Sequence, residues 1–302
     1  MKIKISFIST LFSFVLLFAS CQKDGLYTPK EHLTRIENWE FYDGDSLFRN
    51  AEEWEWDGKL LSKITYLDRA RIPYATLTPS YDSKNRIESF LYEESGMTWT
   101  YQYNYHNNDL CQILVYDQQG EVRGVTTFKK KGGKVAEITL EAYMVSSQNP
   151  LRFILPPEVA EMPAAKASGS SQRTTYQLTW KGNDVVKYVV LDGNADDKVI
   201  STVETTYDNN VNPYQGMLAN TNGYSNINGT FSKHNPLTIA NTGKYNLVDE
   251  YGNEYADADY EVHETYTYEY EGRYPVKQVR DIYRIFEGRP LSYTLKRTYT
   301  YE

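Results

Sequence analysis

Aromatic residues recur at every second position in several stretches of the chain. In "MTWTYQYNY" (97–105) the odd positions are Met or aromatic, and "HETYTYEY" (263–270) places Tyr266, Tyr268 and Tyr270 on the same alternation. Successive side chains of a β-strand point to opposite faces, so a period of two predicts strands with one aromatic face. The alternation returns in "YQLTW" (176–180) and "SYTLKRTYTY" (292–301). The chain is therefore predicted to be all-β.

Turn-forming residues separate these stretches, and successive turns are often about ten to sixteen residues apart. They include Asp57-Gly58, Asn107-Asn108, Gly132-Gly133, Gly182-Asn183 and Glu271-Gly272. Short turns join antiparallel neighbours, which predicts a meander of long hairpins. So many twisted strands are expected to close, or nearly close, into a soluble β-barrel-like sheet. The tyrosine face is then expected to line the interior, where a ring can be buried while its hydroxyl finds a partner.

The N-terminus has the plan of a secretory signal. Lys2 and Lys4 precede an apolar run and then small residues before Cys21. The stretch "LFASC" (17–21) resembles a bacterial lipobox, although Phe18 stands where a smaller aliphatic residue is usual. This resemblance implies that residues 1–20 are removed and that Cys21 carries palmitate or similar acyl chains, anchoring the chain in a membrane. Cys111 would then have no disulfide partner.

The rest of the chain is expected to form one folded unit. Residues 21–34 are predicted to be a tether and residues 35–302 a single all-β domain. Two irregular insertions interrupt the alternation, at 149–173, where Pro, Ala and Ser dominate, and at 208–243, which is rich in Asn and Gly.

A degenerate repeat of aromatic, polar and turn residues runs along the chain. Its copies include "WEWDGKLL" (54–61), "YDSKNRI" (81–87), "YDQQGEV" (116–122) and "YEYEGRYPV" (268–276), which resemble the tyrosine-aspartate repeats of the RHS type. Two further stretches, "TYDNNVNPYQGM" (206–217) and "FSKHNPLTI" (231–239), resemble Bacteroidetes surface lipoproteins with a porin-like fold, and "CQKDG" resembles their export tag. The resemblance implies a barrel anchored in the outer membrane, facing the cell exterior, and it implies no activity.

The sequence offers few catalytic patterns. The net charge of −8 and the lack of a large basic cluster argue against nucleic acid as a partner. The four histidines lack zinc-like spacing and no GxSxG motif is present, so no metal, cofactor or enzyme activity is predicted. The favoured hypothesis is a binding protein for a glycan or peptide. The alternative is a hydrolase of extracellular polymers that uses a carboxylate pair.

Candidate site residues follow from the second insertion, because long loops at one end of a sheet-rich scaffold commonly hold ligands. They are Tyr214, Tyr224, His234 and Asn235, of which the two tyrosines are expected to be exposed. A separate candidate is Ser46, since "DSL" (45–47) resembles a short O-glycosylation acceptor.

The lipobox resemblance predicts that Cys21 is acylated. Cells that express the Cys21→Ala variant and grow with a clickable fatty acid should show no label on the protein, whereas the parent chain should be labelled. Equal labelling of the two chains would contradict an anchor at this cysteine.

Overall fold

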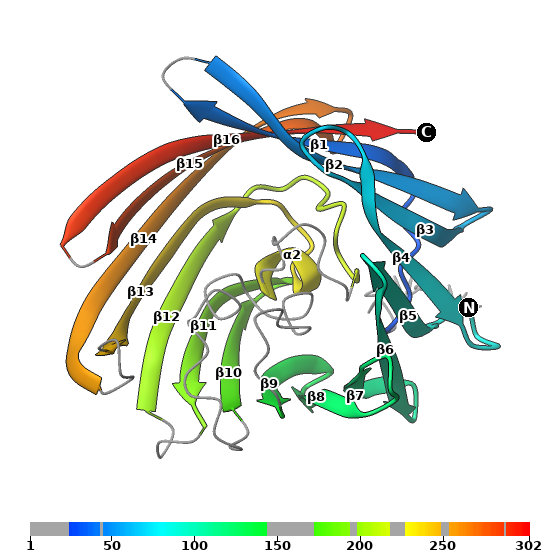
Figure 1. The fold of residues 1–302 in the computed structure, drawn as a ribbon, viewed down its shortest axis with the longest axis horizontal. Helices are drawn as coiled ribbons and strands as arrows, with labels where there is room; N and C mark the ends of the chain where they lie inside the picture. Colours follow the sequence, from blue (N-terminus) through cyan, green and yellow to red (C-terminus); the bar gives the residue numbers. More distant parts are fainter. Residues whose placement is uncertain are drawn as a thin grey trace, which may run out of the picture.

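The computed structural model describes residues 24–42, 45–143, 172–193, 198–217, 227–248, 254–286 and 288–302. Within these ranges sixteen antiparallel strands form a closed barrel in which each strand pairs with its sequence neighbours and β1 pairs with β16 (Figure 1). The predicted all-β closed barrel is confirmed. Its strands are β1 Leu33–Tyr42, β2 Asp45–Asp57, β3 Leu60–Leu67, β4 Pro73–Tyr81, β5 Ile87–Glu94, β6 Met97–His106, β7 Asp109–Tyr116, β8 Val122–Lys131, β9 Lys134–Ala142, β10 Gln172–Lys181, β11 Asp184–Asp192, β12 Lys198–Tyr207, β13 Pro236–Val248, β14 Glu254–Glu271, β15 Tyr274–Phe286 and β16 Arg289–Tyr301.

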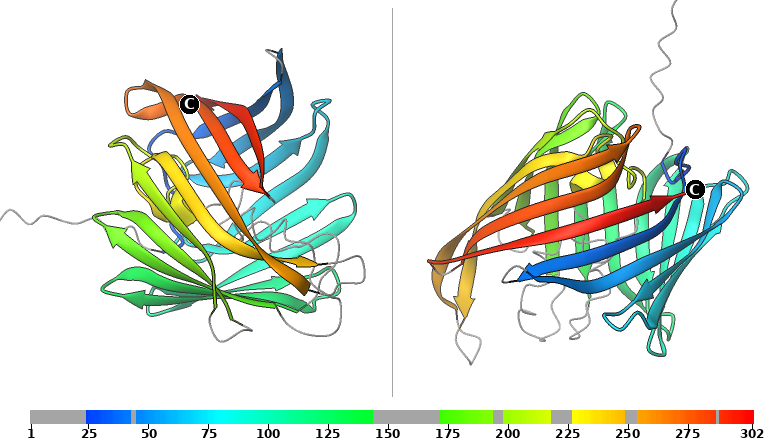
Figure 2. Two further views of the ribbon diagram at one scale, coloured as in Figure 1. Left: turned by 90° about the vertical axis from the view of Figure 1, so that its left-hand side faces the viewer. Right: turned by 90° about the horizontal axis from the view of Figure 1, so that it is seen from above.

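The two ends of the barrel differ. At one end, here called the capped end, β1 begins, β16 finishes and short turns such as those at 57–60 and 106–109 join the strands. The long connection between β12 and β13 also lies at this end and contains the short helix α2 (Ile227–Phe231). Figures 1 and 2 show α2 inside the ring of strands. The opposite end, here called the far end, carries the connections from β1 to β2, β3 to β4 and onward in that alternation.

The tyrosine rows point inward, as predicted. On β6, Tyr101 and Tyr103 expose 2% and 4% of their surface, whereas Gln102 between them is exposed. On β14, Tyr266 exposes 5%, and its ring stacks on that of Tyr268 with centroids 6.3 Å apart. Large aromatic and aliphatic side chains from nearly all strands thus form one interior cluster.

Neighbouring strands that are joined at the far end separate near the capped end, and their backbone pairing stops there. The last pair between β11 and β12, for example, is Lys187 with Glu204. Three residues further on, the Tyr207 hydroxyl donates a hydrogen bond to the Val185 carbonyl at 2.6 Å. A carbonyl that is shielded from water needs a hydrogen-bond donor. Where the backbone pairing has ended, an aromatic side chain supplies that donor.

This contact recurs around the capped end. Eight strand pairs are joined at the far end, and in the described strands seven of them have such an aromatic bridge. The bridges, with donor–acceptor distances of 2.6 to 2.9 Å, are Trp56 to Leu33, Tyr81 to Leu61, Tyr105 to Ile87, Trp180 to Val135, Tyr207 to Val185, Tyr268 to Pro236 and Tyr301 to Pro275.

These bridges account for three of the four quoted copies of the repeat, through Trp56, Tyr81 and Tyr268, whereas the copy at Tyr116 lies at the far end. A β-bulge falls immediately before the bridging aromatic in several copies, for example between Glu55 and Trp56 and between Asn104 and Tyr105. A bulge bends the strand and increases its local twist, which turns the ring over the barrel end. The Tyr-Asp copies add a turn in which the carboxylate accepts two backbone N–H groups. Asp82 accepts from Lys84 and Arg86, and Asp117 accepts from Gln119 and Glu121.

The N-terminal segment is also part of the folded structure. Residues 24–32, assigned to the tether from sequence, lie across the capped end, where Tyr27 is only 2% exposed. Gly25 has a φ of 75°, and a Cβ atom there would lie 1.9 Å from the Tyr105 hydroxyl, so only glycine fits. Its carbonyl accepts a hydrogen bond from the Ile87 N–H. The described residues contain no helix long and apolar enough to cross a membrane.

Truncating an inward tyrosine should strongly destabilise the barrel. The Tyr103 ring packs edge-on against Phe90 with centroids 5.7 Å apart, and loss of such a buried aromatic costs about 3 to 5 kcal/mol. We expect Tyr103→Ala to lower the free energy of unfolding by this amount in denaturant titrations. Gln102→Ala, which changes an outward side chain on the same strand, should alter it by less than about 0.5 kcal/mol. Equal effects would place the tyrosine row outside.

The barrel should also unfold in alkali. Burial raises the pKa of Tyr81 to about 12 and raises those of Tyr105 and Tyr207 as well. The folded state therefore holds these protons more tightly than the unfolded chain, whose tyrosines titrate near pH 10. Stability is complete below about pH 10 and falls as the pH rises further. We expect tyrosinate absorbance and loss of β-sheet circular dichroism to appear together. Ionisation near pH 10 with an intact fold would contradict this.

Candidate functional site

A cap covers part of the capped end. It consists of the described residues 208–217 and 227–235 between β12 and β13. The second insertion is thus shorter than predicted, because residues 236–243 belong to β13. Asn, Thr and Gly weaken the apolar alternation there, although Ile239 and Asn241 both point to the interior and are buried.

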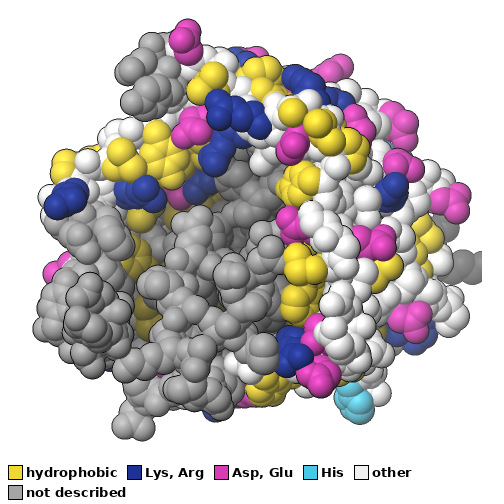
Figure 3. Space-filling view, viewed as in Figure 1, with side chains coloured by type: hydrophobic (Ala, Val, Ile, Leu, Met, Phe, Trp, Pro, Cys, Tyr) yellow, Lys and Arg dark blue, Asp and Glu magenta, His cyan; other side chains and the backbone are white. Residues whose placement is uncertain are grey.

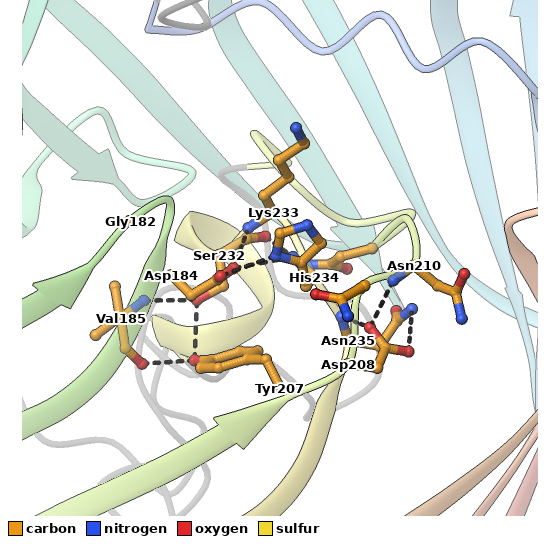
Figure 4. Close-up of polar contacts among 12 residues, drawn as sticks. Gly182, Asp184, Val185, Tyr207, Asp208, Asn210, Ser232, Lys233, His234 and Asn235 are labelled. Carbon is orange, nitrogen blue, oxygen red and sulfur yellow. Dashed lines mark hydrogen bonds and ion pairs between the residues drawn. The ribbon is translucent and has the colours of Figure 1, made fainter. Parts of the chain in front are cut away.

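A polar cluster fixes the cap to the turn between β10 and β11 (Figure 4). The Asp184 carboxylate accepts hydrogen bonds from the backbone N–H groups of Lys233 and His234, at 3.0 and 3.1 Å, and lies 2.8 Å from His234 Nδ1. The Ser232 hydroxyl accepts from the Val185 N–H at 3.0 Å and donates to the Tyr207 hydroxyl at 2.9 Å. An aromatic bridge is therefore tied directly to the cap.

Buried amides hold the cap together internally. The Asn212 side-chain amide donates to the carbonyls of Gly229 and Ser232 at 2.6 and 2.8 Å, and its oxygen accepts from the Tyr214 N–H. The Asn235 amide donates to the Val211 carbonyl at 3.0 Å. Both side chains expose 4% or less of their surface, so each of these hydrogen bonds replaces one to water.

The cap also reaches into the barrel wall. The Tyr214 hydroxyl accepts a hydrogen bond from the Arg297 guanidinium at 2.8 Å, and Arg297 also donates to Asn38 at 2.7 Å. From the other side, the Tyr27 hydroxyl donates to the Pro213 carbonyl at 2.8 Å. Burial raises the pKa of Tyr214 well above its usual range, although the nearby Arg297 opposes the shift.

The site residues predicted from sequence have mainly internal partners. The expectation that Tyr214 is exposed is wrong, because its ring lies against Tyr299 and Arg297 inside the capped end. His234 and Asn235 bind Asp184 and the cap backbone, as described above. Tyr224 and Cys21 lie outside the described residues, as does most of the first insertion. Ser46 is exposed on β2 at the far end, opposite Phe41, and its glycosylation stays a prediction.

A cleft with a volume of about 1460 Å³ opens between the cap and the N-terminal segment. Its apolar lining comes from Leu110, Phe128, Val135, Trp180 and Phe231. No sequence pattern marks this cleft, because these residues come from β7 to β10 and α2 and converge only when the barrel closes. Among the described residues no group of three or more potential metal ligands is close enough to hold an ion.

The cleft lies where the ring of aromatic bridges is broken. Between β7 and β8 the last pair is Gln112 with Thr127, and the position three residues beyond it is Lys130 instead of an aromatic. The Lys130 ammonium forms ion pairs with Asp24 and Asp109, and the Asp24 carboxylate accepts a hydrogen bond from the Leu110 N–H at 2.8 Å. Desolvation opposes charge on Lys130, but its carboxylate partners outweigh that effect and raise its pKa.

Loss of the Asn212 side chain should release the cap without opening the barrel. In Asn212→Ala the carbonyls of Gly229 and Ser232 each lose the hydrogen bond that the Asn212 amide donates, and the loss of such a partner in a buried site costs about 1 to 3 kcal/mol. We expect faster proteolytic cleavage within residues 208–235 and unchanged β-sheet circular dichroism. Asn209→Ala, at an exposed position of the same segment, is the control and should be cleaved at the parent rate.

Comparison with known proteins places the fold. No protein-family model matches the chain, and no curated protein matches it. The chain is similar to the crystal structure of a porin-like protein from Bacteroides uniformis ATCC 8492, with 14% identity, a TM-score of 0.50, and coverage of 92% of this chain and 100% of the other. A porin-like protein from Bacteroides vulgatus ATCC 8482 aligns with 12% identity over 90% of this chain and 99% of its own, with a TM-score of 0.26. The first likeness agrees with the barrel described above.

Proposed function

We propose that the protein is a lipid-anchored binding protein of the bacterial cell envelope that takes up its ligand in the cleft at the capped end. The observation that carries the proposal is the cleft itself. At about 1460 Å³ it is larger than the roughly 300 to 1,000 Å³ of common small-molecule sites, and it combines an apolar lining with amide and basic groups. These dimensions suit an extended ligand, and glycan and peptide are the classes that the sequence predicts.

The outer face of the barrel supports attachment through a tether. Ion pairs cross neighbouring strands on this face, such as Lys129 with Glu137 at 2.5 Å and Lys187 with Glu204 at 2.9 Å. Charged groups facing lipid are costly, and transmembrane barrels present an apolar band there. Figure 3, which looks into the ring of strands, shows basic and acidic side chains interspersed with apolar ones around its rim. We therefore expect the barrel to stand in water, held to the outer membrane by acylated Cys21.

The envelope location draws on two further observations. The lipobox resemblance of residues 17–21 predicts that the chain is exported. The similar Bacteroides uniformis structure is described as porin-like, which fits an origin in the envelope.

A hydrolytic role has less support. Of the carboxylates that line the cleft, Asp24 is bound to Lys130, and Glu31 and Glu271 occupy exposed positions. A glycosidase needs one carboxyl group with a raised pKa beside a second, ionised one. The arrangement in the cleft favours binding over catalysis.

Filling the cleft tests the proposed function. Thr230 lies on α2 in the cleft wall, and Thr230→Trp adds an indole where a ligand would sit. We expect ligands that the parent chain captures from glycan and peptide arrays to lose at least about tenfold in affinity. Thr267→Trp, on the exposed outer face of β14, is the matched control and should bind like the parent. Unchanged affinity in Thr230→Trp would show that the ligand does not bind in this cleft.

A further inference from the structure

The gap in the ring of aromatic bridges distinguishes one place on the barrel from seven equivalent places. Each of the seven bridges puts a ring over the end of a strand pair, whereas at β7 and β8 the corresponding residue is Lys130. The Lys130 ammonium pairs with Asp24 and Asp109, and Phe128 and Leu110 line the cleft beside it. The seven bridged strand pairs thus provide a reference for the β7–β8 pair. The only described pair that departs from the pattern lies at the cleft.

Lysines distant in sequence gather at this gap. Lys134 follows the β8–β9 turn, and its ammonium contacts the Gly182 carbonyl in the next turn and lies 5.1 Å from the centre of the Trp180 ring. Lys233 comes from the cap, and its side chain points away from the polar cluster that fixes its backbone (Figure 4). Lys30 lines the cleft from the N-terminal segment.

The side chains that line the cleft carry a net positive charge, whereas the whole chain is negatively charged. Five basic and three acidic side chains are among its described lining residues, whereas the whole chain carries a net charge of −8. One of the three carboxylates, Asp24, is already neutralised by Lys130. The cleft therefore offers unused positive charge directly beside an apolar surface formed by Phe128, Val135 and Phe231.

The position of the N-terminal segment indicates how the cleft is oriented relative to the membrane. Asp24 lines the cleft and is three residues from Cys21. Three residues of extended chain span about 10 Å. If Cys21 is acylated, the mouth of the cleft lies close to the surface of the membrane that holds the anchor.

We propose that the cleft binds an anionic phospholipid of that membrane, with the phosphate group at Lys134 and Lys233 and part of an acyl chain on Phe128, Val135 and Phe231. The inference rests on the proposed function, since it names the ligand of the same cleft. The match is one of charge and polarity: a phosphate needs cationic donors, and an acyl chain needs apolar contact immediately next to them.

Short-chain lipids below their micelle concentration test this without a bilayer. The mature chain with Cys21→Ala lacks the anchor and keeps every described residue, and calorimetry would compare dihexanoyl phosphatidylglycerol, dihexanoyl phosphatidylcholine and glycerophosphate. We expect the phosphatidylglycerol to bind, the phosphatidylcholine to bind more weakly and glycerophosphate, which lacks the acyl chains, not to bind. Each lysine near a lipid phosphate contributes about fivefold, so Lys134→Gln with Lys233→Gln should weaken phosphatidylglycerol binding by about 25-fold.

Matched variants separate the possible outcomes. The control variant Lys198→Gln with Lys244→Gln removes the same charge in the half of the barrel towards the far end, and it should leave the affinity unchanged. Thr230→Trp should abolish binding. Equal affinity for the two phospholipids, or equal effects of the two lysine pairs, would overturn the lipid proposal. Binding of a glycan or peptide that is sensitive to Thr230→Trp, without lipid binding, would refute the lipid and keep the proposed function. If no lipid, glycan or peptide binds in the cleft, both proposals fail.

Discussion

The need to satisfy backbone groups where paired strands separate governs the capped end of this barrel. Strands joined at the far end separate as they approach the capped end, and their carbonyls lose partners on the neighbouring strand. A tyrosine hydroxyl or an indole N–H reaches across and donates in place of the missing ladder bond, as Tyr105 does to Ile87 and Trp56 to Leu33. Each ring also buries apolar area, so a single residue type meets both requirements.

The cap depends on the same arrangement. Tyr207 bridges β12 to β11 and also contacts Ser232, and Tyr268 bridges β14 to the first residue of β13, where the cap ends. The insertion could therefore grow between β12 and β13 without disturbing the strands that flank it. At β7 and β8 the bridge is absent, and the Asp24 carboxylate of the N-terminal segment instead accepts a hydrogen bond from the Leu110 N–H and pairs with Lys130. The cleft at this position therefore coincides with the loss of one aromatic bridge, while the strand pairing of the barrel stays complete.

The sequence predicted the parts of the fold that local rules determine. Alternation in 97–105 and 263–270 identifies strands and their inward faces, because the period of two is a property of each strand alone. It did not predict which loops meet. Tyr214 was expected to be exposed because its neighbours are Asn, Pro and Gly, yet Arg297, 83 residues away, draws it inward. The lysines of the cleft likewise come from turns that become adjacent only through the pairing of β9 with β10 and the return of the cap.

The meeting of the first and last strands has a consequence for engineering. His32 and Glu302 exchange two backbone hydrogen bonds, so the ring of strands, from β1 to β16, starts and finishes at one point on the capped end. A linker that crosses the capped end could join residue 302 to residue 24 and so keep the N-terminal segment, and the backbone could be reopened at an exposed far-end turn such as residues 68–72. The resulting circular permutant would keep all sixteen strand pairings. Attached to a membrane through its new terminus, it would hold the same cleft turned away from the bilayer.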